Sequence, residues 1–200
     1  MTLGRHTKDR VTPAYFAMNK TTKTILTLGA LLVGAAVIRS RSRKHAPLET
    51  VPSVDLSRYE GRWYEIAALP QRFEKGCHCV YAEYRKHPDG YVEVYNSCRK
   101  GGPEGEAEGV QGKAFPVEGS SYSKLKVQFF WPFRGDYWIL ELDPDYQHVL
   151  VGSPDRDSLW ILSRTPTLDS AIYNLMVQQA RSKGFPVEQL RKTDQRCFAA

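Results

Sequence analysis

The stretch Gly61-Arg62-Trp63-Tyr64-Glu65-Ile66 decides how the rest of the chain is interpreted, because it opens the first clear β-strand of the sequence. Glycine permits a tight turn or a close backbone approach, and a large indole two residues later can fill the end of a small barrel. Far along the chain, Leu159-Trp160-Ile161-Leu162-Ser163-Arg164 predicts a last strand that ends in arginine. Since a guanidinium packs favourably on an indole face, we expect Trp63 and Arg164 to touch and close one end of a barrel.

Between these two stretches the sequence predicts a series of short antiparallel strands. His87-Pro88-Asp89-Gly90 indicates a hairpin, since Asp-Gly is a strong turn signal, whereas the glycine-rich residues 101–109 favour a loop. One face of a strand at 124–131 is apolar and consists of Leu125, Val127, Phe129 and Trp131. Roughly eight strands are expected, near residues 61–68, 80–85, 91–97, 110–116, 124–131, 137–142, 148–152 and 159–164, and this spacing predicts a closed barrel or a sandwich.

A single amphipathic helix follows the strands. Thr167 is the expected N-cap and Gly184 the expected stop. The apolar face of this helix comprises Leu168, Ile172, Leu175, Met176 and Ala180, so we expect the helix to pack against the outside of the barrel.

The N-terminal part carries an apolar run at 24–38, flanked by lysines before it and by arginines and Lys44 after it. Its 15 residues fit the core of an export signal or a short membrane anchor better than a full membrane span. Translation from Met18 instead of Met1 would place a basic segment directly before this run. Residues 45–52 contain two prolines and are expected to form an exposed linker. We therefore divide the chain into a signal or anchor segment with its linker at 1–50 and a barrel domain at 51–200.

The positive charge of the chain belongs to its N-terminal part. Residues 1–50 contain nine basic and two acidic residues, a net charge of +7, whereas residues 51–200 contain 19 basic and 20 acidic residues, a net charge of −1. A domain that binds nucleic acid is expected to carry its basic patch on the fold itself. A near-neutral barrel therefore argues against a nucleic-acid partner.

Several motifs resemble the lipocalin family. Gly61-x-Trp63 is similar to its first motif, Leu142-Asp143-Pro144-Asp145-Tyr146 to its second, and Arg164 at the end of the last strand to its third. The run at 154–166 is specific for the branch of bacterial outer-membrane lipoproteins, which is similar to apolipoprotein D and temperature-induced lipocalins. The resemblance covers about residues 54–197. It assigns barrel closure to Gly61, Trp63, Asp143, Tyr146 and Arg164.

The resemblance implies an eight-stranded up-and-down barrel with one external helix and a cup for a fatty acid or a lysophospholipid. The protein would then be a non-catalytic lipid carrier of the bacterial cell envelope, membrane-associated through residues 24–38 and without a cofactor. Monomer and homodimer both remain open. Candidate cup residues are Leu125, Val127, Phe129, Trp131, and from the next strand either Tyr137 and Ile139 or Trp138, Leu140 and Leu142. The alternatives are an envelope enzyme acting on a lipid-derived substrate and an interaction protein whose barrel is filled by its own side chains.

Four cysteines in an apparently exported barrel favour two disulfides over a metal site, although Cys77-His78-Cys79 contains residue types that bind metals. Four cysteines allow three pairings. A hairpin would bring Cys77 near Cys98. The similarity to apolipoprotein D implies that Cys79 joins Cys197 in the C-terminal tail.

Overall fold

The computed structural model describes residues 45–198 of the chain. The apolar run at 24–38 and both candidate start residues lie outside the described residues. Within residues 45–198, none of the helices combines the length and the apolar character needed to cross a membrane.

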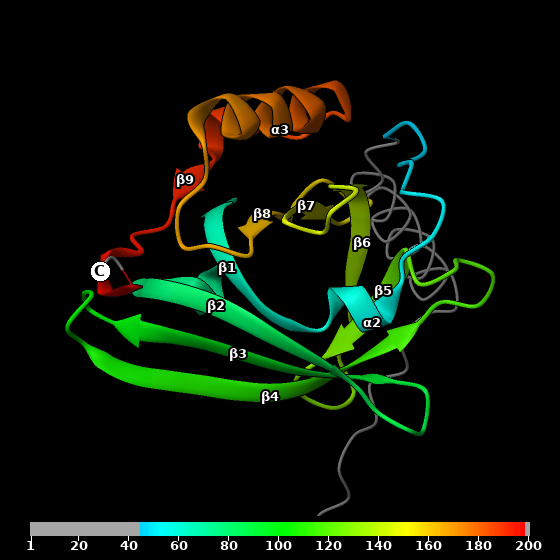
Figure 1. Cartoon of the computed structure of the whole chain (residues 1–200), viewed down its shortest axis with the longest axis horizontal. Helices are drawn as coiled ribbons and strands as arrows, with labels where there is room; N and C mark the ends of the chain where they lie inside the picture. Colours follow the sequence, from blue (N-terminus) through cyan, green and yellow to red (C-terminus); the bar gives the residue numbers. More distant parts are fainter. Residues whose placement is uncertain (1–44, 199–200) are drawn as a thin grey trace, which may run out of the picture. The chain divides into compact units, whose positions relative to one another are not determined.

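Eight antiparallel strands form a closed up-and-down barrel, which confirms the predicted fold (Figure 1). Each strand pairs with the next along the chain, and the first strand also pairs with the last. The strands are β1 (Gly61–Ala68), β2 (Cys77–Lys86), β3 (Val92–Lys100), β4 (Glu106–Pro116), β5 (Lys124–Gln128), β6 (Gly135–Leu142), β7 (His148–Gly152) and β8 (Leu159–Ser163). A short ninth strand, β9 (Arg191–Lys192), pairs with the end of β1.

Several strand boundaries differ from the sequence prediction, and two of them have a clear physical cause. The strand β5 ends at Gln128, so Trp131 is not part of the barrel wall, and its side chain is 86% exposed. The chain bends here because Pro132 has no N–H to donate to a ladder and Phe133 N–H instead closes a turn onto Phe130 O. In contrast, β4 begins at Glu106, within the glycine-rich segment expected to be a loop. A side chain at Gly109 would collide with the Tyr95 hydroxyl, which explains a glycine inside this strand.

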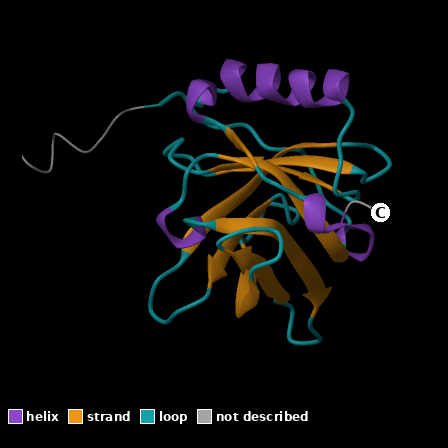
Figure 2. Cartoon of the chain, turned by 90° about the vertical axis from the view of Figure 1, so that its left-hand side faces the viewer, coloured by secondary structure: helices purple, strands orange, loops and turns teal. Residues whose placement is uncertain are grey.

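The helix α3 (Ser170–Ser182) lies on the outside of the barrel, as Figure 2 shows. It begins two residues later than expected, because the Asp169 side chain, not Thr167, accepts the N–H groups of Ala171 and Ile172. Met176 is buried, but the expected core residue Leu175 is 52% exposed, since it lies one residue away from the buried stripe. The remaining helical segments are short: α2 (Leu56–Tyr59), η1 (Arg72–Glu74), η2 (Val187–Gln189) and η3 (Arg196–Phe198).

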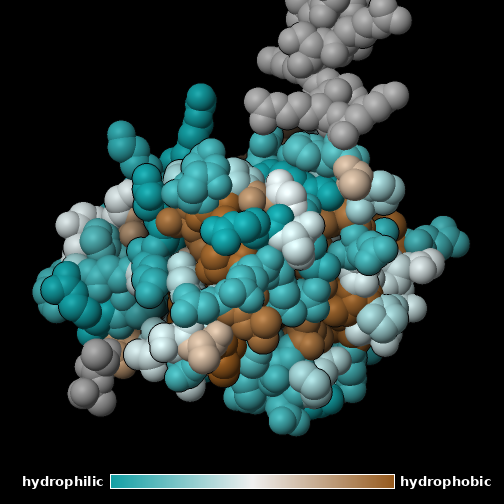
Figure 3. Space-filling model, turned by 90° about the horizontal axis from the view of Figure 1, so that it is seen from above, coloured by the Kyte–Doolittle hydropathy of each residue, from teal (hydrophilic) through white to brown (hydrophobic). Residues whose placement is uncertain are grey.

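The barrel separates two hydrophobic cores. The inner core fills the barrel around Trp63, Leu125 and Ile139, whereas the outer core lies between α3 and the strands β1, β6, β7 and β8. Figure 3 shows the side that carries α3, where hydrophilic side chains cover most of the surface and hydrophobic residues show between them. Leu48 belongs to the outer core and is 7% exposed. The prediction of an exposed linker at 45–52 is therefore wrong at Leu48, which packs into the outer core, whereas Glu49 and Pro52 are exposed.

One end of the barrel is closed by Trp63 and Arg164. The Trp63 side chain is fully buried, and the Arg164 guanidinium carbon lies 3.9 Å from the centroid of its ring. The same guanidinium donates to the carbonyls of Arg58 (2.7 Å), Arg62 (2.8 Å) and Tyr146 (3.2 Å). Arg164 therefore joins α2, β1 and the β6–β7 turn, which carries Asp143, whose Oδ2 accepts the N–H groups of Asp145 and Gln147. Gly61 has a φ of +88°, a conformation that favours glycine at this crowded end.

The C-terminal tail completes the barrel wall where β1 and β2 separate. These strands pair only from Gly61 to Tyr64 on the β1 side. Beyond Tyr64, the side-chain amide of Gln195 donates to Glu65 O and to Val80 O, both at 2.7 Å, so that one side chain bridges the two strands. Two disulfides are present, Cys77–Cys98 and Cys79–Cys197, and the second holds this tail in place.

We predict that Trp63→Ala lowers the free energy of unfolding by about 3–5 kcal/mol, the range for deletion of a buried large aromatic side chain. Trp131→Ala is the matched control, because its ring is 86% exposed, and it should change this free energy by less than about 0.5 kcal/mol. Urea unfolding of both variants measures the difference. Equal stabilities would show that Trp63 does not hold the barrel end together.

The two disulfides should differ in their contribution to stability. They join residues 118 positions apart (Cys79–Cys197) and 21 positions apart (Cys77–Cys98). Loop-closure entropy then gives up to about 5 kcal/mol for the first and about 3 kcal/mol for the second. Paired Cys→Ser replacements of each bridge, unfolded by denaturant, test this order. A larger loss from removal of Cys77–Cys98 would contradict the role of the tail as part of the wall.

Candidate functional site

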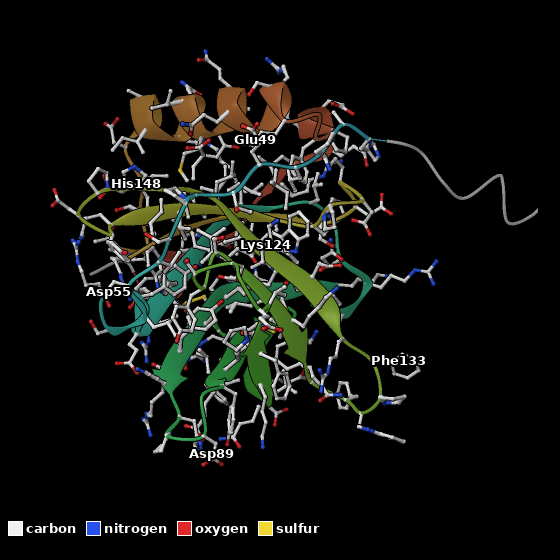
Figure 4. All side chains as sticks on the ribbon, turned by 90° about the vertical axis from the view of Figure 1, so that its right-hand side faces the viewer. Glu49, Asp55, Asp89, Lys124, Phe133 and His148 are labelled. Atoms are coloured by element: carbon white, nitrogen blue, oxygen red, sulfur yellow. A yellow bond between two sulfur atoms is a disulfide. The ribbon has the colours of Figure 1, made fainter. Side chains whose placement is uncertain are left out.

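A cavity of about 520 Å³ lies inside the barrel. It is lined by residues of six strands, which places it within the barrel and not on its surface: Glu65 of β1, Ala82 and Tyr84 of β2, Val94 and Asn96 of β3, Val127 of β5, Tyr137 of β6, and Trp160 and Leu162 of β8. Residues of the β1–β2, β5–β6 and β7–β8 loops also contribute. In an up-and-down barrel these loops share one end, so the cavity opens opposite the end closed by Trp63. Figure 4 shows Phe133 at this mouth, on the far side from Asp55.

Three tyrosines lie at the closed end of the barrel, and two of them, Tyr84 and Tyr137, line the cavity as its floor. The hydroxyl of Tyr137 lies 2.8 Å from that of Tyr59 and 3.0 Å from that of Tyr84. Burial raises the pKa of Tyr84 to about 12 and also raises the pKa of Tyr59 and of Tyr137 well above the usual value. These hydroxyls therefore stay neutral and satisfy one another, so the floor presents ring edges and no charge.

One wall of the cavity is apolar. Val94, Val127, Phe129 and Leu162 line it, together with the ring of Tyr137. Phe129 fits there because position 112 is a glycine: a Cβ at Gly112 would lie 2.6 Å from the Phe129 Cδ1 atom. This wall offers contact to an apolar group and no hydrogen-bond partner.

A polar wall adjoins the apolar one, since Glu65 pairs with Leu162 across β1 and β8, and Asn96 follows Val94 by two residues on β3. Glu65 accepts a hydrogen bond from the Thr193 hydroxyl, and Glu74 accepts one from the Trp160 indole N–H at 3.3 Å. Burial raises the pKa of Glu65, and the nearby charge of Glu74 raises it further; burial likewise raises the pKa of Glu74. The Asn96 Oδ1 atom is buried and has no partner within the described residues. The cavity is thus amphipathic, with a hydrocarbon side and an acceptor-rich side.

The structure sorts the predicted cup residues into four groups. Val127, Phe129 and Tyr137 line the cavity, whereas Leu125 and Ile139 are buried in the inner core. Trp138 and Leu140 belong to the outer core, so they do not face the cup; Trp138 packs under Lys124, whose Nζ lies 4.3 Å from its ring centroid. Trp131 is exposed on the β5–β6 loop. Of the two sets proposed for β6, Tyr137 and Ile139 face the barrel interior. Leu142 of the other set also packs against the inner core, because a bulge between Ile139 and Glu141 shifts the alternation.

The polar wall was missed by the sequence analysis, although its first member left a signal. Glu65 follows Trp63 by two residues, and side chains two apart on a strand share a face. Trp160 has the same relation to Leu162. Glu74 and Thr193 come from a loop and from the tail, where periodicity gives no guidance.

A second hollow, of about 920 Å³, is lined mainly by polar and charged residues of β2, β3 and β4. Glu83, Arg85 and Glu93 alternate with Tyr84 and Val94, whose side chains face the barrel interior, so this hollow lies on the outer face. It lacks the enclosed apolar wall of the inner cavity. As for metals, residues 45–198 contain no group of three His, Cys, Asp or Glu side chains that could hold an ion.

Comparison with known proteins agrees with this geometry. The model of the lipocalin-like domain matches residues 54–195. Temperature-induced lipocalin-1 of Arabidopsis thaliana is 42% identical over 156 residues, which cover 74% of this chain and 83% of the plant protein. Outer membrane lipoprotein Blc of Escherichia coli K12 is 40% identical over 166 residues, which cover 82% of this chain and 93% of the bacterial protein.

Among solved structures, insecticyanin of the tobacco hornworm Manduca sexta superposes with a TM-score of 0.58 at 21% identity. The alignment covers 75% of this chain and 86% of insecticyanin, and at this identity it supports the fold alone. The domain match extends over most of the chain, and both relatives share its sequence at 40% identity or more. The chain therefore belongs to the lipocalin family.

Proposed function

We propose that the protein is a non-catalytic carrier that holds a single-chain lipid, a fatty acid or a lysophospholipid, in its inner cavity. Lipocalins bind small hydrophobic ligands, and most act as carriers and not as enzymes. The observation that carries the proposal is the one-ended cavity of about 520 Å³ with an apolar wall. Its volume falls within the usual range for small-molecule sites. A cavity of this size also argues against a barrel filled by its own side chains.

The shape of the cavity suits a chain that enters from the mouth and ends on the tyrosine floor. Each buried methylene contributes about 0.8 kcal/mol, so a chain of about 12 carbons has ample driving force after the costs of association. Side chains that line only one apolar wall leave the adjoining side free for a polar group. A lipid with one chain and one head matches this division.

We expect affinity to rise with chain length until the cavity is full and then to level off. Titration of the full chain with saturated fatty acids of 6 to 18 carbons, followed by the fluorescence of Trp160 in the cavity wall, measures this dependence. A second variant, Val127→Phe, places a larger side chain on the apolar wall and narrows the cavity, so its affinity should level off at shorter chains. Equal affinity for short and long chains would contradict a chain held inside the barrel.

We further propose that the protein works at a membrane of the bacterial cell envelope. Relatives that are 40% identical are named outer membrane lipoproteins, whereas others come from plants and mammals. Support from the structure comes from the mouth, where four aromatic side chains are exposed: Phe73, Phe130, Trp131 and Phe133. Aromatic rings favour the interface between water and lipid, so this rim suits contact with a bilayer. The segment 24–38 would supply a second attachment.

Trp131 offers a test of this rim, because it is exposed and does not line the inner cavity. We expect Trp131→Ser to slow lipid transfer from the loaded full chain to vesicles by roughly tenfold, since the loss of one interfacial aromatic weakens bilayer contact. Affinity for a dissolved fatty acid should stay unchanged. Leu175→Ser on α3 is the control, as an exposed apolar residue away from the mouth. Equal transfer rates for both variants would show that the aromatic rim does not mediate contact with the bilayer.

A further inference from the structure

The polar wall of the cavity presents several hydrogen-bond acceptors. The carboxyl groups of Glu65 and Glu74 line it, and so does Asn96, whose Oδ1 is buried and unpartnered within the described residues. Two nearby donors bind these carboxyls, and a third, Arg134, packs on an aromatic ring. The Thr193 hydroxyl and the Trp160 indole N–H donate to the two carboxyls, and the guanidinium of Arg134 lies over the Phe115 ring at 4.2 Å.

Neither carboxyl forms an ion pair within the described residues, although the charge of Lys100 acts on Glu74 and lowers its pKa. The ion pairs found among residues 45–198 include neither Glu65 nor Glu74. Glu65 is only 6% exposed, and a buried carboxylate without a cation is costly. Two carboxyls that raise each other's cost of ionisation would both be stabilised by a single cation placed between them.

We propose that this wall is a subsite for the head of the bound lipid and that it selects a head carrying a cationic amine. The inference rests on the proposed function and narrows its ligand class. An ammonium group donates up to three hydrogen bonds, which matches the acceptors of Glu65, Glu74 and Asn96. The rings of Trp160 and Phe73 line the same cavity and favour a cation over their faces. A carboxylate head would instead find no opposite charge on these two carboxyls and would make their ionisation still less favourable.

The position of the subsite agrees with a chain that points to the floor. Glu74 precedes β2 in the β1–β2 loop, and Trp160 is the second residue of β8, so both lie toward the mouth. Leu162 of β8, Val94 of β3 and Tyr84 of β2 line the cavity nearer the closed end. An amine at Glu74 would therefore leave its alkyl chain along the apolar wall.

Three amphiphiles of equal chain length separate the contribution of the head group to affinity from that of the chain: dodecylamine, dodecanol and dodecanoate. With the full protein at pH 6, we expect dodecylamine to bind roughly tenfold more tightly than dodecanol, the gain typical of a charge-assisted hydrogen bond, and dodecanoate to bind most weakly. Glu74→Gln and Glu65→Gln should each remove most of this preference while dodecanol affinity stays the same. Glu118→Gln, an exposed carboxyl in the β4–β5 turn, is the matched control.

Calorimetry in buffers of different ionisation enthalpy adds a second measurement. Because burial raises the pKa of both carboxyls, they keep protons at pH 6 in the empty cavity, and a bound ammonium should displace them into solution. Dodecanol should release none. The other titratable groups facing the pair are Lys100, which acts on Glu74, and the cavity residues Tyr81, Tyr84, Arg134, Asp136, Tyr137 and Asp155. If the Glu65→Gln/Glu74→Gln double variant still released protons on binding dodecylamine, the protons would come from other groups and the subsite would be overturned.

The outcomes distinguish the two proposals. Tighter binding of dodecanoate than of dodecylamine, or an amine preference that both glutamine variants keep, would overturn the amine subsite and leave the carrier function standing. Failure of all three amphiphiles to bind would contradict the carrier function itself. Glu74 lies in a short loop helix and Glu65 within β1, so Glu74→Gln still decides the question if Glu65→Gln does not fold, as judged by circular dichroism.

Discussion

The contact between the Arg164 guanidinium and the Trp63 ring is the constraint on which the cavity depends. It joins the first strand to the end of the last, at 3.9 Å between guanidinium and ring, and ties three backbone carbonyls to one side chain. A sheet that closes on itself has no free edges, and a plugged end turns the resulting tube into a cup. The inner cavity is one-ended for this reason.

The opposite half of the barrel is completed by a different device. Beyond Tyr64 the first two strands part, and the tail fills the gap through Gln195 and through the Cys79–Cys197 bridge. The tail brings the Thr193 hydroxyl to Glu65, inside the wall. Part of the polar character of the cavity, at Glu65, therefore comes from the side where the first two strands part. Asn96 adds a polar group from the continuous strand β3.

Regular alternation explains how much of this could be predicted from the sequence. The eight strands follow from period-two patterns, the external helix from an apolar stripe at helical spacing, and the contact of Trp63 with Arg164 from two distinctive residues. Trp131 was assigned wrongly to the cup, because the apolar alternation of the sequence continues past Gln128. The strand itself ends at Gln128, before the turn that contains Pro132. Leu48 was assigned wrongly because proline content suggested a linker, while burial depends on a distant helix.

The polar wall shows a different limit of sequence reasoning. Glu65 could be placed inside by its spacing from Trp63, but a glutamate in a strand is ordinarily expected to face water. Glu74 and Thr193 reach the same cavity from a loop and from the tail, and only the three-dimensional closure brings them together. Pairs of this kind have no signature in a single sequence.

A crystal structure with a bound 12-carbon chain that carries bromine at its far end tests the central claim most directly. The anomalous signal of bromine marks the chain end without assumptions about the rest of the ligand. We expect the bromine at the floor of the cavity, beside Tyr84 and Tyr137, with the head toward Glu74. Bromine on the outer face, near Gln111 and Lys113, or its absence from the barrel would contradict a cup that holds a single lipid chain.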